Sequence, residues 1–117
     1  MVKLSAVIDA LELKVMSPPK DLDIMIETAC VSDLLSHVMA TCPGNSLWIT
    51  AQGHSNVIGV ASLLDMQAVL LAGGSLPDEN VVSKATEAGV ALLWSKHNAF
   101  DICGKLYNLG IRGPLTE

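Results

Sequence analysis

Short, continuous apolar runs recur in the second half of the chain, and a segment with apolar residues at helical spacing follows each run. The runs are Leu47–Ala51, Ala68–Ala72 and Val90–Trp94. Each is too short for a long helix and too apolar for a half-exposed strand, so we expect strands buried on both faces. The segments that follow, predicted to be helices, are Ser55–Leu64, Asp78–Ala88 and Asn98–Leu109. Such alternation predicts right-handed crossovers and a mainly parallel sheet flanked by helices, an α/β fold.

The stretch from Ala68 to Gly89 has the clearest local signals. Two glycines, Gly73 and Gly74, follow the apolar run and predict a tight turn. Pro77 and the two acidic residues after it suit the first turn of a helix, where the backbone dipole favours negative charge. Gly89 is placed to end that helix in the left-handed conformation. The stretch therefore predicts a strand, a glycine turn and a capped helix.

The first half of the chain has weaker periodicity. We expect a helix, a short strand, a second strand and a helix capped by Ser32. Their predicted bounds are Val2–Leu11, Leu13–Met16, Ile24–Val31 and Asp33–Ala40. With Gly110 as the last helix cap, residues 1–111 form one predicted domain, and residues 112–117, which hold a glycine and a proline, form a predicted loose tail.

Composition narrows the class of protein. The chain has 117 residues and is half hydrophobic, with only two Trp, one Tyr and one Phe, so its core must be aliphatic. Its net charge of −5 and scattered basic residues argue against binding to nucleic acid or to acidic membranes. The most apolar region, Val57–Ala72, is interrupted by Asp65 and is shorter than the roughly 20 residues of a membrane-spanning helix.

The cysteines and the N-terminus indicate the compartment. Cys30, Cys42 and Cys103 are odd in number and widely spaced, which fits neither a zinc site nor a disulfide framework. The N-terminus has no basic stretch followed by an apolar core, so no signal peptide is expected. We expect three reduced thiols in a cytoplasmic protein.

Polar residues gather where the predicted strands end. Ligands of open parallel sheets bind beyond the carboxyl ends of the strands, and each loop there leads into a helix N-terminus that favours an anion. Ser32 and Asp33 lie in an equivalent loop. The candidate ligand-binding residues are Gln52, His54, Ser55, Asn56, Gly73, Gly74, Ser75, Ser95, His97 and Asn98.

Plainer interpretations of these residues stay open. The glycine pair can serve the turn alone, the serines can be helix caps, and His54 and His97 can be ordinary surface histidines. Two histidines without a third ligand do not make a metal site. No nucleotide-binding glycine loop, no GxSxG and no HExxH occurs, so the sequence predicts no catalytic residue and names no cofactor.

Several blocks of the chain together resemble the DRTGG domain family, most clearly over Leu47–Ile111. The chain departs from the pattern of the family at three places: Ala72 replaces its threonine, Gly53 and His54 lie near the place of its Asp-Arg pair, and Asn98 replaces an aspartate. The two-glycine turn carries over at Gly73 and Gly74. The blocks that carry the resemblance are Leu47–Gln52, Asn56–Ala61, Leu70–Gly74, Pro77–Glu79, Ala85–Leu93 and Ala99–Phe100.

The resemblance implies an α/β module similar in fold to the N-terminal domain of HPr kinase/phosphorylase. It implies a regulatory or assembly role, commonly as a homodimer, and a context of hydrogenase or histidine-kinase systems. It does not imply kinase activity, because the phosphate-binding loop of that enzyme lies in a different domain.

Three functions follow as hypotheses. The first is a non-catalytic, ligand-sensing regulatory dimer that binds a nucleotide or small anionic metabolite. The second is an adaptor that docks a partner enzyme of a hydrogenase or kinase system, favoured by the high apolar fraction. The third, a small enzyme, would need an activated serine or histidine among the candidate residues.

Overall fold

The computed structural model describes residues 1–114 and contains five helices and seven strands over that range. The helices are α1 (Leu4–Leu11), α2 (Leu35–Thr41), α3 (Asn56–Leu63), α4 (Glu79–Ala88) and α5 (Ala99–Asn108). The strands are β1 (Val2–Lys3), β2 (Lys14–Ser17), β3 (Met25–Ile26), β4 (Thr28–Val31), β5 (Ser46–Thr50), β6 (Ala68–Ala72) and β7 (Leu92–Ser95).

The main sheet has five strands in the order β2-β7-β6-β5-β4. β4, β5, β6 and β7 run parallel, and β2 pairs antiparallel with β7 at one edge. A second, two-stranded sheet joins β1 to β3. The expected α/β fold with a mainly parallel sheet is therefore confirmed, with one antiparallel strand that the sequence pattern did not reveal.

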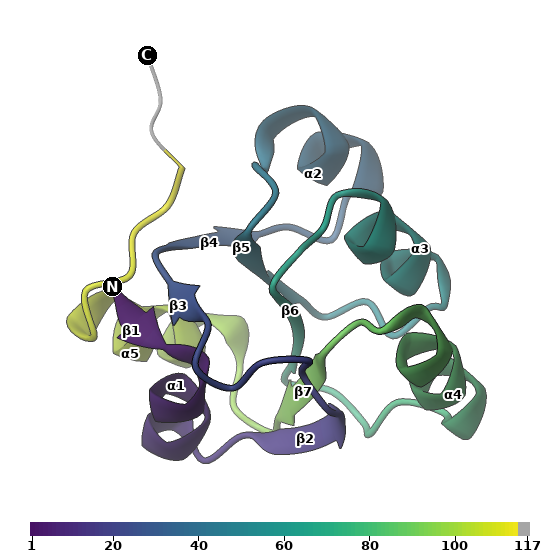
Figure 1. The fold of residues 1–117 in the computed structure, drawn as a ribbon, viewed down its shortest axis with the longest axis horizontal. Coiled ribbons are helices and arrows are strands. Elements are labelled where there is room, and N and C mark those ends of the chain that lie inside the picture. The colour runs from purple at the N-terminus through teal and green to yellow at the C-terminus, as the bar shows by residue number, and fades with distance from the viewer. Residues whose placement is uncertain (115–117) are drawn as a thin grey trace.

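Helices cover both faces of this sheet, with α1 and α5 on one side and α2, α3 and α4 on the other (Figure 1). The central strands feed both layers because successive side chains point to opposite faces. On β6, Leu70 packs with α1 and α5, whereas Val69 and Leu71 pack beneath the other three helices. All five residues of β5 and of β6 are buried, which explains the uninterrupted apolar run of β6 and the apolar centre of β5, Leu47–Ile49.

Two predicted elements of the first half are wrong in detail. The predicted helix Val2–Leu11 begins only at Leu4, because Val2 and Lys3 pair with β3 instead. The predicted strand Ile24–Val31 is two strands in different sheets, separated at Glu27. Both errors have one cause: β1 and β3 are distant segments whose pairing no local pattern contains.

The helix ends agree with the sequence at glycines and differ at two N-termini. Gly89 and Gly110 have the left-handed φ values of 72° and 98° that were expected. Ser32 is not the cap of α2; its Oγ accepts a hydrogen bond from the Leu34 N–H (3.1 Å) in a turn before the helix. Pro77 precedes the N-cap Asp78 and so lies outside the first turn of α4.

The predicted tail, residues 112–117, lies partly outside the described residues. Within them, Arg112 forms an isolated parallel bridge with Thr28 on the outer edge of β4. The Ala29 N–H donates to the Arg112 carbonyl (3.0 Å), and the Arg112 N–H donates to the Glu27 carbonyl (3.3 Å). This bridge covers part of an edge strand that would otherwise expose unpaired backbone groups.

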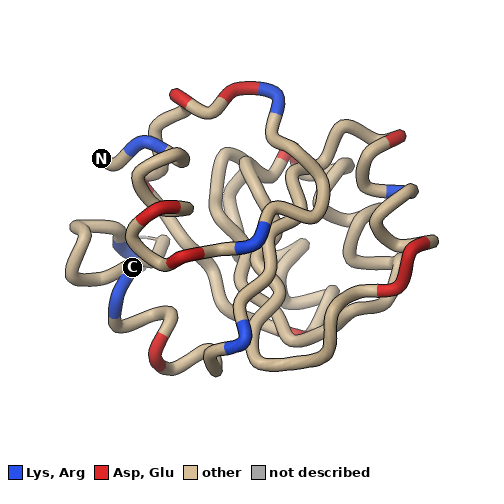
Figure 2. Tube along the Cα trace, turned by 90° about the horizontal axis from the view of Figure 1, so that it is seen from below, with Lys and Arg blue, Asp and Glu red and all other residues tan. Residues whose placement is uncertain are grey.

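Among residues 1–114, no helix is both long enough and apolar enough to cross a bilayer. The few basic residues are spread along the chain and do not gather on one face (Figure 2).

Gly89→Ala is expected to lower the free energy of unfolding by roughly 1 kcal/mol, because a Cβ there needs a left-handed φ and would lie 2.6 Å from Lys20 Cε. Urea denaturation measures the change. Gly59→Ala is the matched control, since Gly59 lies inside α3 with no atom within 4 Å of an added Cβ, and it should be neutral or stabilising by up to about 1 kcal/mol. Equal effects of the two substitutions would contradict this account of Gly89.

Candidate functional site

The loops that follow β4, β5, β6 and β7 all lie at one edge of the sheet, because these four strands are parallel. We call the ten candidate residues there the carboxyl-edge rim. Two contacts connect neighbouring loops directly: the Gly73 N–H donates to the Ser95 carbonyl (3.0 Å), and Trp94 Nε1–H donates to the Gly74 carbonyl (3.2 Å). The expected juxtaposition of the loops is therefore present, while its role in binding remains a prediction.

Asp33 organises the part of the rim that follows β5. Its Oδ1 accepts hydrogen bonds from Thr50 Oγ1 (2.7 Å) and from the Ala51 N–H (2.8 Å). Thr50 Oγ1 in turn accepts a hydrogen bond from the Gln52 N–H (3.1 Å). The side-chain amide Nε2 of Gln52 donates to the Asp33 carbonyl (3.4 Å). Gln52 is thus held by a network that spans two strands. Asp33 was not among the candidate residues, although an acidic residue directly after a strand was a visible signal.

The two glycines of the rim have different roles. Gly73 has φ of 70°, and a Cβ on it would lie 3.3 Å from Asn98 Cα, so glycine is required by the turn and by the close approach of the next loop. An added Cβ at Gly74 would meet only the Ala72 carbonyl oxygen, at 4.0 Å. Gly73 therefore fits the turn-only interpretation, and Gly74 is the position where the backbone stays open to an approaching ligand.

Four rim side chains make hydrogen bonds within the chain, and that of Gln52 is described above. Ser95 Oγ, which is buried, accepts from the His97 N–H (3.1 Å), and Asn98 Oδ1 caps α5 by accepting from the Asp101 N–H (3.1 Å). His54 Nδ1 accepts from the Asn56 N–H (3.1 Å), which leaves its Nε2 at the surface side of the loop as the remaining polar atom. Helix caps were expected among the serines, but Asn98 is the residue that caps α5, and Ser55 makes no side-chain cap bond.

Three other rim side chains are exposed and make no side-chain hydrogen bond within residues 1–114, whereas Ser55 is half-buried. The three are His97, Asn56 and Ser75. Phe100, two residues after Asn98 at the start of α5, is 86% exposed. Sequence reasoning did not place Phe100 in a site; its signal was its position two residues before Ile102, on the side of the helix opposite the buried positions.

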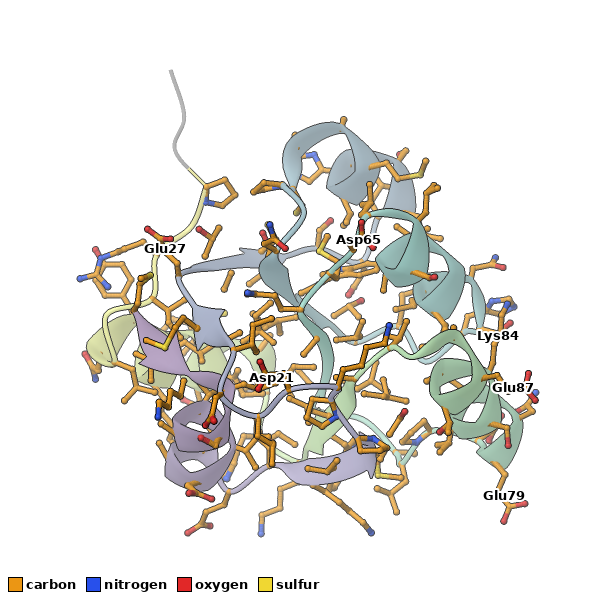
Figure 3. The ribbon with its side chains drawn as sticks, in the orientation of Figure 1. Asp21, Glu27, Asp65, Glu79, Lys84 and Glu87 are labelled. Atoms are coloured by element: carbon orange, nitrogen blue, oxygen red, sulfur yellow. The ribbon has the colours of Figure 1, made fainter. Side chains whose placement is uncertain are left out.

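A cleft of about 180 Å³ lies at the opposite, amino edge of the parallel strands. The carboxyl-terminal ends of α3 and α4 and the loop before β3 enclose it, and its polar lining includes Lys20, Asp21 and Asp65. Figure 3 shows Asp21 and Asp65 on separate sides of this region. Gln67 Nε2 donates to the Met25 carbonyl (2.9 Å), and Gln67 Oε1 is buried without a hydrogen-bond partner among the described residues.

The cleft was not predicted from the sequence. The loop at residues 18–24 crosses the amino edge because β2 and β3 lie in different sheets, and no local pattern contains that crossing. The left-handed residues Asn45, Asp65 and Gly89 all line the cleft. Asn45 lies just before β5, Asp65 follows α3 and Gly89 follows α4, so the left-handed backbone of each serves a turn at the end of an element.

The cysteines are free, as expected. Burial, and then a hydrogen bond with Cys42, raises the pKa of the Cys30 thiol to about 12. Burial also raises the pKa of Cys103. A thiol is nucleophilic as its anion, so neither group is suited to nucleophilic chemistry at neutral pH. Within residues 1–114, no three potential metal ligands come together.

Comparison with known proteins gives one informative match. A scan against models of known protein families finds no match, and a search of the curated proteins finds no relative. Among solved structures, the chain is similar to the CBS and DRTGG domains of the regulatory region of Clostridium perfringens pyrophosphatase, a structure complexed with its activator, diadenosine tetraphosphate. The TM-score is 0.76 at 11% identity, over 90% of this chain and 46% of that chain.

This match is a likeness of fold. It supports a DRTGG-like fold for this chain, in agreement with the resemblance of several sequence blocks to that family. The chain spans less than half of the similar structure, and 11% identity carries no residue roles from one protein to the other.

Asp33→Ala should destabilise the fold by about 1 to 3 kcal/mol, because it leaves the buried Thr50 hydroxyl and the Ala51 N–H without their acceptor. Chemical denaturation of Asp33→Ala, Thr50→Val and the double variant gives the coupling between the two side chains, expected on the order of 1 kcal/mol. Asp78→Ala is the matched carboxylate control, since Asp78 makes no side-chain cap bond. Additive losses would show that the two side chains are not coupled and would contradict this account of their hydrogen bond.

The Cys30 thiol should make stability depend on pH in the alkaline range. The unfolded chain loses this proton near the ordinary thiol pKa of 9.0, whereas the folded chain keeps it until about pH 12. The unfolded state therefore binds fewer protons in that window, and the free energy of unfolding falls as pH rises. Compared with the wild type, Cys30→Ala should have a shallower slope between these pH values in denaturation series. Parallel slopes would contradict the burial of this thiol.

Proposed function

We propose that this chain is a non-catalytic, ligand-sensing regulatory domain of the DRTGG family that acts as a homodimer and binds a nucleotide or small anionic metabolite at the carboxyl-edge rim. The observation that carries the proposal is the convergence of four strand-to-helix loops on one edge of the sheet. In this arrangement, the N-termini of α3, α4 and α5 all begin from the loops of the rim.

Anion binding follows from the local chemistry of these loops. Backbone N–H groups at helix N-termini favour negative charge, and the backbone at Gly74 is open to close approach. The exposed imidazole of His97 and the amide of Asn56 add hydrogen-bond donors that the fold does not use.

The choice of a nucleotide as the leading ligand is supported by the similar pyrophosphatase regulatory region, whose structure holds a nucleotide activator. A regulatory role is supported by the same neighbour, which is a regulatory region. A cytoplasmic location remains part of the proposal.

The alternative is an adaptor that docks a partner enzyme, such as one of a hydrogenase or kinase system. Exposed apolar side chains around α2 favour it: Val31, Leu34 and Met39 are each more than half exposed. Apolar side chains gathered in this way mark a protein–protein contact more often than a small-ligand site. Co-purification with a defined partner that Leu34→Asp abolishes would favour this alternative.

The ligand hypothesis is tested by the melting temperature of the chain with ATP, diadenosine tetraphosphate and acetyl phosphate. A ligand at about 100 times its Kd should stabilise the fold by roughly 2.7 kcal/mol, a shift of several degrees. His97→Ala and Gly74→Val should reduce that shift at least several-fold while leaving the melting temperature of the free protein unchanged. His37→Ala, an exposed histidine on α2 outside the rim, is the matched control.

The outcomes separate the hypotheses. No shift with any probe, in a chain that still folds, would contradict ligand sensing by these compounds. A shift that the rim variants leave intact, but that Gln67→Leu or Asp65→Asn removes, would place binding in the amino-edge cleft and contradict the rim. Turnover of a probe, lost in His54→Ala and His97→Ala, would instead support a small enzyme.

A further inference from the structure

The outer face of α5 carries aromatic side chains that the core does not bury. Ile102 and Leu106 point into the core, whereas Phe100 is 86% and Tyr107 is 59% exposed. Residues seven positions apart in a helix lie on the same side, two turns from each other. The two aromatic rings therefore stand at opposite ends of one exposed helical stripe.

Gly104 lies between them on the same side. It is in the middle of α5, where glycine costs about 1 kcal/mol relative to alanine. An added Cβ there would meet no atom within 4 Å. Unlike Gly73 and Gly89, this glycine has no steric reason within the described chain. Its place between two aromatic side chains leaves a shallow saddle, which a second helix can approach closely.

The ring of Tyr107 is held in place. The Arg112 guanidinium carbon lies 3.7 Å from the ring centroid, and Arg112 Nη1 donates to the Tyr107 carbonyl (2.8 Å). An exposed ring that is already ordered loses less conformational entropy when a partner covers it. The stripe is thus partly prepared for contact at this end.

The charges beside the stripe complement one another under a two-fold axis. Asp101 and Lys105 are four residues apart, so they share one flank of α5, with the acid toward its N-terminus and the base toward its C-terminus. When two copies of a helix pack antiparallel about a two-fold axis, the same flanks meet with their ends exchanged. Asp101 of one copy then faces Lys105 of the other, and Phe100 faces Tyr107.

We propose that the α5 stripe, defined by Phe100, Gly104 and Tyr107 and flanked by Asp101 and Lys105, is the surface on which a second copy of this chain packs antiparallel. The proposal rests on the homodimer of the proposed function and specifies its interface. It does not depend on whether a ligand binds the rim. Asp101 and Lys105 supply the orientation, because only an antiparallel two-fold pair brings this flank of one copy against the same flank of the other.

The size of the stripe sets the strength of the contact. Aromatic side chains bury about 150 to 250 Å² each, so two rings per copy give an interface near the low end of specific contacts. We therefore expect a dimer that dissociates in the micromolar range, visible only when the protein concentration is varied. The adjoining surface of α1, which contacts α5, extends the contact area.

Charge-reversal variants test both the face and its orientation by sedimentation equilibrium between about 1 µM and about 1 mM, a range that brackets a micromolar Kd. Asp101→Lys and Lys105→Asp each place like charges opposite one another, so each alone should weaken the dimer about tenfold or more. An equimolar mixture of the two variants restores both pairs and should form a heterodimer at wild-type strength. Gly104→Trp should fold, since its surroundings are open, and should be monomeric.

Leu63→Asp is the matched control, because Leu63 is a 69% exposed residue of α3 on the other face of the sheet. A dimer that Leu63→Asp dissociates, and that the α5 variants leave intact, would overturn this interface but leave the homodimer standing. A wild-type chain that is monomeric throughout the range would overturn both. Singly reversed variants that stay monomeric when mixed would overturn the antiparallel orientation. Ligand-induced melting shifts, measured on the same variants at low concentration, report on the rim separately.

Discussion

The parallel pairing of β4, β5, β6 and β7 is the constraint from which the rest of this structure follows. Parallel neighbours can be connected only by crossovers, and each crossover here is a helix that must cover one face of the sheet. The crossover helices α2, α3 and α4 cover one face, and α1 and α5 cover the other, so all residues of the central strands β5 and β6 are buried. The same rule places every strand-to-helix loop at one edge and every helix-to-strand loop at the other.

The two edges of the sheet are therefore chemically different. The carboxyl edge collects helix N-termini, whose free N–H groups favour anions, and polar loops held by the Asp33 network. The amino edge collects the carbonyl ends of α3 and α4, with Asp21 and Asp65 nearby, around the cleft. A small anion suits the first edge better than the second, which is the physical reason for placing the proposed ligand at the rim although a cleft is present opposite it.

The glycines of this chain differ in whether the fold explains their presence. Gly89 has a left-handed backbone, and Gly73 combines one with a close contact to the neighbouring loop, so the fold itself accounts for both. Gly104 has neither feature. The distinction depends on three-dimensional surroundings, and it is what directs attention to the outer face of α5 as a contact surface. The exposed aromatic side chains of Phe100 and Tyr107 lie on the same face of α5 and support this interpretation.

The sequence by itself determined the elements whose signals are local. Uninterrupted apolar residues at Ala68–Ala72 predicted a buried strand, because a strand covered on both faces needs no polar side. The left-handed cap at Gly89 and the parallel order of the later strands followed from equally local patterns. Tertiary structure alone decided the antiparallel β2, the division of Ile24–Val31 into β3 and β4, the bond between Asp33 and Thr50, and the cleft beneath α3 and α4. Each of these depends on partners distant in the chain, and no periodicity in a short window records which distant segment a residue will meet.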